Sequence, residues 1–203
     1  HHDLVVVTTD EDREDRAVIR RLLRECPCPV WVIRPSRARV QRVLAAVNPE
    51  PSELGLNRMI LELSASLVEL HGGELHLAHA WELYGESTMR GSAFMSLPPA
   101  DVDALVEGAR VSHERALEQL LSDCGLDGQP WRIHLDKGSA AELVPGLVAK
   151  HRINLLVMGT VARTGANRMV MGNTAERVLD EVNCSVMAIK PEGFVSPILP
   201  PES

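Results

Sequence analysis

A glycine-punctuated polar segment near the carboxyl end of the chain contains the residues best suited to bind an anion. It follows an apolar run, contains Gly159, Gly165 and Gly172, and leads into a helical pattern near Asn173. A loop that leaves a parallel strand and enters a helix aims backbone N–H groups and the helix dipole at a ligand. Glycines let the main chain approach closely or take positive φ, and Asn173 is a favoured N-cap residue. The segment therefore predicts an anion site, with a plain connection as the alternative.

Two arginines, Arg163 and Arg168, add positive charge to this segment in a chain whose net charge is −7. The glycine spacing matches neither the P-loop pattern G-x-x-x-x-G-K-[ST] nor the dinucleotide pattern G-x-G-x-x-G. The segment alone therefore indicates the chemistry of a ligand and no particular family of nucleotide-binding proteins.

The composition is that of a globular chain, with 203 residues of which 45% are hydrophobic and 24% charged. The negative net charge disfavours nucleic-acid binding, since such proteins normally present a basic face. No apolar run approaches the roughly 18–20 residues of a membrane span, so none is predicted. The four cysteines, Cys26, Cys28, Cys124 and Cys184, are typical of small buried side chains in a reducing compartment, and a cytoplasmic protein is expected.

Strand-like and helical periods alternate after about residue 40. Strands are predicted at 42–48, 74–81, 131–138, 153–159 and 184–191, with helices between them. Ser139 and Glu142 form a capping box for one helix, which Pro145 is expected to kink or shorten. Strands separated by helices indicate βαβ units and a parallel sheet covered on both faces.

The segment 82–100 is too long for a simple connection. It holds Tyr84, Met89, Phe94 and Met95 among small residues. One interpretation is a surface loop, and the other is a lid or apolar wall beside a ligand pocket. The second interpretation leaves room for a lipid or acyl group.

The first 35 residues repeat the end of the later unit. The sequence "HHDLVVVTT…RRLLRECPCPVWVIRP" aligns with "RINLLVMGT…ERVLDEVNCSVMAIKP" as strand, loop, helix, cysteine, strand, basic residue and proline. We therefore predict a C-terminal fragment of a first domain at 1–35, a complete second domain at 36–190 and a tail at 191–203. A fragment of two strands and one helix cannot bury a core alone, so it must dock on the second domain or on another chain.

The combination "VMGT…MGNTAERVL…CSVMAIKP" resembles the universal stress protein family, in its tandem-domain branch. The resemblance implies an α/β fold with an open five-stranded parallel sheet of order 3-2-1-4-5 and helices on both faces, similar to adenine-nucleotide α-hydrolases. It also implies ATP or AMP bound at the strand ends, and antiparallel self-association through the last strand of each domain.

The resemblance also implies which residues hold the nucleotide. Asn48 and Ala80 are expected on the base and ribose side. Arg163 is added to the expected ligand-binding residues because of its charge, and not from the resemblance. The phosphate side is expected to consist of Met158, Gly159, Val161, Ala162, Gly172, Asn173 and Thr174.

This chain departs from the family pattern at three of these positions. Ala162 stands in place of a glycine, Asn173 in place of a serine or threonine, and Asn48 in place of an acidic residue that would bind magnesium. No metal is therefore predicted. The first copy has "DEDRED" where the second has its glycines, so a nucleotide is expected in the second copy only.

No Ser/His/Asp set or carboxylate pair stands out, and the protein is not expected to be an enzyme. His76 and His79 are three residues apart on a predicted strand, so they face opposite sides and cannot share a metal. The favoured function is a non-catalytic, adenine-nucleotide-binding regulator of the stress response. One alternative is an interaction protein whose degenerate site holds another ligand, lipid or acyl-bearing. A weak ATPase is the other.

Overall fold

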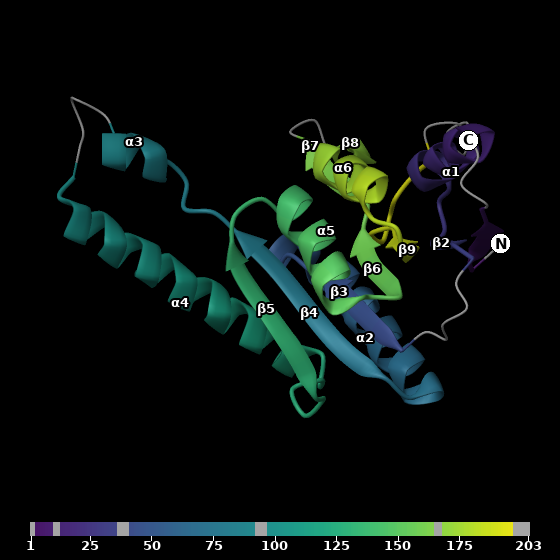
Figure 1. Ribbon diagram of the computed structural model, residues 1–203, viewed down its shortest axis with the longest axis horizontal. Helices are drawn as coiled ribbons and strands as arrows, with labels where there is room; N and C mark the ends of the chain where they lie inside the picture. Colours follow the sequence, from purple (N-terminus) through teal and green to yellow (C-terminus); the bar gives the residue numbers. More distant parts are fainter. Residues whose placement is uncertain (1–2, 10–12, 36–40, 92–96, 165–167, 197–203) are drawn as a thin grey trace.

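One mixed sheet runs through the computed structural model, which describes residues 3–9, 13–35, 41–91, 97–164 and 168–196, without the side chains of 13–15, 162–164 and 168–170. Within these residues the sheet has seven strands in the order β1-β2-β9-β6-β3-β4-β5 (Figure 1). The strands are β1 (Val5–Thr8), β2 (Val30–Ile33), β3 (Arg42–Ala46), β4 (Glu74–Trp81), β5 (Trp131–Lys137), β6 (Leu155–Gly159) and β9 (Ser185–Ile189).

The strands of the second copy have the predicted order 3-2-1-4-5, as β5-β4-β3-β6-β9, and all four of their pairings are parallel. The prediction that the sheet has five strands and is wholly parallel is wrong. β1 and β2 extend it, because β2 pairs antiparallel with β9. Both of these strands are apolar, and an open edge on either would expose backbone groups that can pair.

This pairing confirms the predicted antiparallel contact between the last strands of the two copies, here within one chain. Because β2 and β9 already pair with each other along these edges, the same contact between two chains would require the chains to exchange strands. Association between chains stays a prediction.

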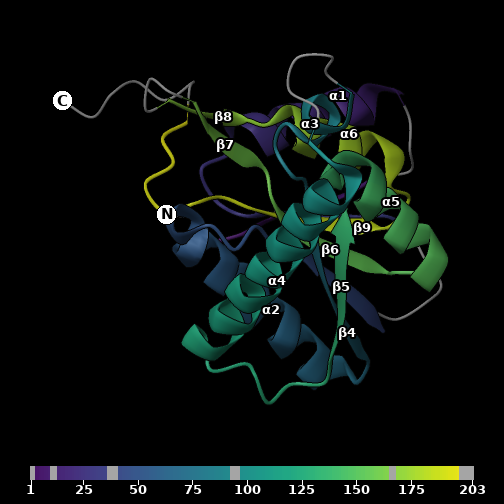
Figure 2. The same cartoon turned by 90° about the vertical axis from the view of Figure 1, so that its left-hand side faces the viewer.

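Helices cover both faces of the sheet. α1 (Arg13–Glu25), α5 (Ala140–His151) and α6 (Asn173–Glu181) contribute to one apolar core, and α2 (Leu54–His71) and α4 (Pro99–Asp123) contribute to the other (Figures 1 and 2). In β6, Leu156 and Met158 face the first core while Leu155 and Val157 face the second, as strand geometry requires. No helix within the described residues is long and apolar enough to span a membrane.

The connection that follows β4 is not one long loop, as the sequence had suggested. A helix, α3 (Glu86–Gly91), forms within it, and α4 begins at Pro99, where the fixed φ of proline suits the first turn. Arg90 binds Glu86 at 2.9 Å and Asp103 of α4 at 2.7 Å, which fixes α3 against the longer helix. Tyr84 is 99% exposed and forms no apolar wall. Phe94 and Met95 lie outside the described residues.

The predicted N-cap Ser139 of α5 is confirmed, but its side chain accepts a hydrogen bond from the N–H of Ala141 at 3.3 Å, and not from Glu142 as a capping box requires. The expected shortening at Pro145 is wrong, because the helix continues through Pro145 to His151. The cysteines are free thiols, and Cys26 Sγ lies 3.3 Å from Cys28 Sγ at hydrogen-bond distance.

Candidate functional site

A cleft opens at the carboxyl ends of β3 and β6, where the strand order reverses. The chain passes from β3 to β4 on one side, whereas β6 lies on the other side of β3. Open α/β sheets bind ligands at such a reversal, because the loops leaving the two strands diverge there. The helices that follow these strands also begin at this edge, so their positive dipole ends lie close to it.

The cleft has a cavity volume of about 440 Å³, within the range of small-molecule sites. β3, the start of α2, the start of α5, the end of β6 and the start of α6 all contribute to it. Its lining residues are Ala46, Val47, Asn48, Ser52, Glu53, Leu56, Asn57, Ile60, Ala140, Val144, Met158, Gly159, Val161, Thr174 and Val178.

Half of the residues predicted for a nucleotide site line this cleft: Asn48, Met158, Gly159, Val161 and Thr174. Ala80 is half-buried in β4 and is not among the lining residues, and neither are Gly172 and Asn173 at the start of α6. The backbone of Ala162 and Arg163 belongs to a strand near the cleft, and their side chains lie outside the described ones.

The glycine-punctuated segment is a β-hairpin and not the loop that the sequence predicted. Its strands are β7 (Val161–Thr164) and β8 (Arg168–Met171), paired antiparallel with Val161 opposite Met171. Ala162 is therefore in a strand, a conformation that its Cβ tolerates without strain. The family's glycine is not needed there to give a positive φ.

Gly172 and Asn173 also differ from their expected roles. The N-cap of α6 is Gly172, with φ −76°, and Asn173 is the first helical residue, so the predicted Asn173 cap is wrong. The N–H of Gly172 donates to the carbonyl of Thr160 at 3.1 Å. This bond closes the hairpin onto β6, and it removes the Gly172 amide from the donors that a phosphate could use.

Gly159 does not take positive φ, contrary to one of its two predicted roles. Its value is in close packing, since a Cβ on this residue would lie 2.7 Å from Cδ2 of Leu56. Leu56 belongs to α2 and lines the cleft. A glycine at this point therefore lets β6 pass against α2 without displacing the Leu56 side chain.

The turn that leaves β3 is fixed by an amide clamp that sequence reasoning missed. Asn57, 2% exposed, donates from Nδ2 to the carbonyl of Asn48 at 2.5 Å, and its Oδ1 accepts from the Asn48 N–H at 3.3 Å. An isolated asparagine among the apolar positions 56, 60 and 61 of α2 was the available signal. Because both backbone groups of Asn48 are held, this wall of the cleft is rigid.

His79 holds the residue before Asn48 in the same wall of the cleft. Its Nδ1 lies 3.2 Å from the carbonyl of Val47, and its Nε2 lies 2.9 Å from Nδ1 of His113. Burial and the nearby His113 lower the pKa of His79 to about 4. A neutral His79 must carry its proton on Nδ1 because the carbonyl only accepts, so His113 donates to its Nε2.

The described side chains that line the cleft include one charged group, Glu53, and no lysine or arginine. Among the described residues, the donors available to an anion are therefore backbone N–H groups, hydroxyls and side-chain amides. The first turn of α6 offers N–H groups without helical partners, and Thr174 of that turn lines the cleft. A hydroxyl and a helix dipole thus face the same cavity.

The histidines do not gather at the cleft. His76 packs against His134 and His151 on the α5 side of the sheet, while His79 contacts His113 of α4. The prediction that His76 and His79 face opposite sides of their strand is confirmed. Within the described part of the chain, no group of three or more His, Cys, Asp or Glu residues has an arrangement that could hold a metal ion.

Comparison with known proteins places this fold and site in context. A family model described as "Universal stress protein family" matches residues 39–190. Universal stress protein E of Escherichia coli K12 is 28% identical over 207 residues, covering 97% of this chain and 63% of that protein. A universal stress protein E homolog of Haemophilus influenzae is 30% identical over 201 residues, covering 94% of this chain and 63% of that protein. The chain thus spans 63% of the length of these curated relatives.

Solved structures show the same similarity. A functionally unknown protein of Pseudomonas aeruginosa PAO1 superposes with a TM-score of 0.70 at 25% identity, covering 93% of this chain and 63% of that one. A universal stress protein of Archaeoglobus fulgidus superposes with a TM-score of 0.57 at 18% identity, covering 93% of this chain and 60% of that one, and shares the fold.

Proposed function

The chain belongs to the universal stress protein family, and we propose that its cleft at the carboxyl ends of β3 and β6 binds an adenine nucleotide. The observation that supports this most is the position of the cleft: a cavity of about 440 Å³ at the strand-order reversal, with the first turn of α6 in its lining. Parallel sheets with this reversal bind nucleotides at that point, with phosphate at a helix N-terminus.

The cleft offers different surroundings to the two ends of such a ligand. Ala46, Val47 and Val144 provide apolar contacts for a base, beside a turn that Asn57 holds rigid. Thr174 at the start of α6 provides a hydroxyl for phosphate. We therefore place the base between β3 and α5 and the phosphates against α6.

The proposed role is regulatory and non-catalytic. Glu53 is the one carboxylate among the described lining side chains, and neither a histidine nor a cysteine accompanies it. A nucleophile with an adjacent base is the usual requirement for group transfer, and this set of residues does not supply one. Bound ligand would then change the stability or the partners of the protein, in a response to stress.

Calorimetric titration of the folded protein with ATP, ADP and AMP tests this proposal. We expect saturable binding of one nucleotide per chain, and no phosphate release above background when ATP is incubated with the protein. Flat titrations for all three nucleotides would exclude the proposed ligand class. Steady release of phosphate from ATP, by a protein that binds one nucleotide per chain, would favour the weak ATPase.

A second candidate function has its own support. The Gly172 N–H is already bonded to Thr160, and the described lining contains no basic side chain. These features favour a ligand with less negative charge than ATP, including an acyl-bearing one held by an interaction protein. Mass spectrometry of small molecules released from the denatured protein distinguishes the two candidates.

A further inference from the structure

Two thiols lie in contact in the connection between α1 and β2. The sequence there is Cys26-Pro27-Cys28-Pro29, and Cys26 Sγ lies 3.3 Å from Cys28 Sγ. Both cysteine side chains are half-buried, with the exposed Pro27 between them. A pair of neighbouring sulfur atoms is therefore accessible to small molecules in solution.

The backbone holds the two sulfur atoms in this arrangement. The N–H of Cys26 donates to the carbonyl of Leu22 in the last turn of α1, and the N–H of Val5 donates to the carbonyl of Pro29, both at 2.9 Å. Each cysteine precedes a proline, which fixes its own φ and restricts the residue before it to extended backbone. The segment has therefore already lost much of the conformational freedom that joining its two thiols would cost.

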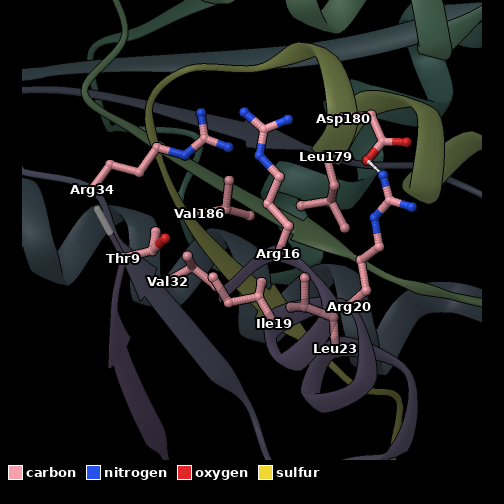
Figure 3. A pocket seen from close by; sticks show the side chains of 10 residues that line it. All are labelled: Thr9, Arg16, Ile19, Arg20, Leu23, Val32, Arg34, Leu179, Asp180 and Val186. Carbon is pink, nitrogen blue, oxygen red and sulfur yellow. Dashed lines mark hydrogen bonds and ion pairs between the residues drawn. The ribbon is translucent and has the colours of Figure 1, made fainter. Parts of the chain in front are cut away.

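The end of α1 that leads into this segment is attached to the second copy. Arg20 binds Asp180 of α6 at 2.6 Å (Figure 3), and Arg24 binds Glu176 of the same helix at 2.6 Å. The buried Leu23 lies in the apolar core to which α1 and α6 both contribute. Cys26 thus follows a helix end that is held in place.

A buried cation lies near Cys26. Lys190, which follows β9, is 4% exposed, and its Nζ donates to the carbonyl of Leu23 and to Thr160 Oγ1, the latter at 2.8 Å. Burial lowers the pKa of Lys190 to about 8, and attraction between its ammonium group and a Cys26 thiolate opposes this shift. Because the ammonium form predominates at neutral pH, its charge favours the thiolate of Cys26.

Cys28 has the opposite character. Burial raises the pKa of its thiol, and the hydrogen bond to Cys26 raises it further. A hydrogen bond that raises the pKa of Cys28 is one in which the Cys28 S–H donates and the Cys26 sulfur accepts. The pair therefore contains one sulfur suited to attack and one that keeps its proton until a later step.

The second copy lacks this arrangement of thiols. The repeat aligns Cys28 with Cys184, and Cys26 with Val182. Cys184 is buried, and burial raises the pKa of its thiol to about 11. Such a thiol is typical of core packing, so the reactive pair is a feature of the first copy.

We infer that Cys26 and Cys28 form a redox-active dithiol that disulfides of low molecular mass oxidise to an intramolecular disulfide. The Cys26 thiolate attacks one sulfur of the small disulfide RS–SR, so a mixed disulfide forms at Cys26 and RS⁻ leaves. Cys28 then gives its proton to solvent and attacks Cys26 Sγ, which forms the bond between the two cysteines and releases the second RS⁻. The dithiol loses two electrons, and RS–SR gains them.

The local geometry permits this bond. The Cα atoms of residues two apart are separated by at most about 7 Å, and the bend of the chain at Pro27 and Cys28 shortens this separation toward the usual range for a disulfide. The sulfur atoms must approach by about 1.3 Å, from 3.3 Å to a bond of about 2 Å. Rotation about the Cα–Cβ bonds supplies an approach of this size.

Oxidised glutathione is the probe that tests this inference, applied at pH 7.5 to the folded, fully reduced protein. After an acid quench and alkylation of the remaining thiols, mass spectrometry follows the products. The parent protein should lose two thiols and retain no glutathione on them. Digestion should yield a peptide in which Cys26 and Cys28 are joined, and dithiothreitol should restore both thiols.

Single variants assign the two roles. Cys28→Ser removes the sulfur that completes the exchange, so this variant should retain one glutathione at Cys26. Cys26→Ser should acquire glutathione at Cys28 at least about threefold more slowly, since a raised thiol pKa lowers the thiolate fraction more than it raises nucleophilicity. Cys124→Ser is the matched control: Cys124 is half-buried at the end of α4, and its loss should leave formation of the internal disulfide at the parent rate.

A parent protein that keeps a stable glutathione adduct on Cys26 or Cys28, and forms no internal disulfide, would overturn the inference. So would equal rates of adduct formation in the two single variants, or a reaction at this pair no faster than at Cys124. Nucleotide binding at the β3/β6 cleft is independent of every one of these outcomes.

Discussion

Trp31 of β2 lies directly opposite Met187 of β9, and the two residues occupy equivalent positions in the internal repeat. The pairs on either side show the same symmetry. Val30 lies opposite Ala188, and Val32, which is equivalent to Ala188 in the repeat, lies opposite Val186. An approximate twofold axis therefore passes between Trp31 and Met187, and it relates the pair β1 and β2 to the pair β6 and β9.

Burial of Trp31, and not the ion pairs between α1 and α6, should contribute most to the contact between β2 and β9. Trp31 packs against the core that contains Met187, while the side chains of Arg20 and Asp180 are 59% and 49% exposed. Trp31→Ala should lower the free energy of unfolding by about 2 kcal/mol, below the range for a fully buried aromatic residue. Urea denaturation measures this, and faster amide exchange in β1 and β2 locates the effect.

Asp180→Ala is the comparison for the docking prediction. Because an exposed ion pair contributes little, it should cost less than about 1 kcal/mol and leave amide exchange in β2 slow. A larger cost for Asp180→Ala than for Trp31→Ala would show that charge, and not apolar burial, holds the two copies together.

Filling the space beside Gly159 should impair the cleft. In Gly159→Ala, the added Cβ would lie 2.7 Å from Leu56 Cδ2, so the leucine must rotate, and the cavity is the space beside it. We expect nucleotide affinity to fall about tenfold, with a stability change of about 1 kcal/mol. Gly55→Ala is the matched control, since a Cβ there has nothing within 4 Å. If both variants bind nucleotide with the affinity of the parent protein in parallel titrations, the ligand does not contact this wall of the cleft.

The strands of the second copy were predictable because most of them are short apolar runs between strong helical periods, whereas their order followed from the family resemblance. Leu155, Leu156 and Val157 are all fully buried, and a run of this kind has few other places in an α/β protein. The hairpin of β7 and β8 was not predictable. Each of its strands has only four residues and contains an arginine, and strand propensity depends on a partner that the sequence does not reveal.

The candidate site, like the fold, was predictable only in part. The residues predicted by resemblance mostly follow strands, and those at the ends of β3 and β6 line the cleft. Leu56, Asn57 and Ile60 were missed because they lie on the buried face of α2, where helical periodicity indicates core packing. A residue on such a face lines a cavity only where the opposite element recedes, and that depends on Gly159.

The Asn57 clamp should be measurable as a loss of stability and of ligand binding. Asn57→Ala leaves the buried carbonyl and N–H of Asn48 without their side-chain partner, at a cost of about 1–3 kcal/mol. Thermal unfolding and calorimetry of the same variant should show both losses together. Unchanged nucleotide affinity in a destabilised Asn57→Ala protein would indicate that the rigidity of this turn does not matter for the ligand.

Stability should fall with acidification, and His79 should account for part of the slope. Its pKa is lowered to about 4 in the folded protein, whereas an unfolded histidine titrates near 6.5. The unfolded state therefore binds more protons between these values, so the stabilising contribution is complete above about pH 6.5 and is lost as pH falls toward 4. The loss amounts to about 3 kcal/mol at the acid end. Burial lowers the pKa values of His76 and His134 as well, which steepens the fall.

Urea midpoints measured between pH 7.5 and pH 5 test this linkage. His79→Gln removes the titrating ring, so it should flatten the dependence on pH even though it costs stability at pH 7.5 through the lost contacts to Val47 and His113. His71→Gln, at an exposed position at the end of α2, controls for the loss of an imidazole and should keep the parent slope. If the His79→Gln protein keeps the full slope, the acid sensitivity arises elsewhere, and the cluster of His76, His134 and His151 becomes the next group to replace.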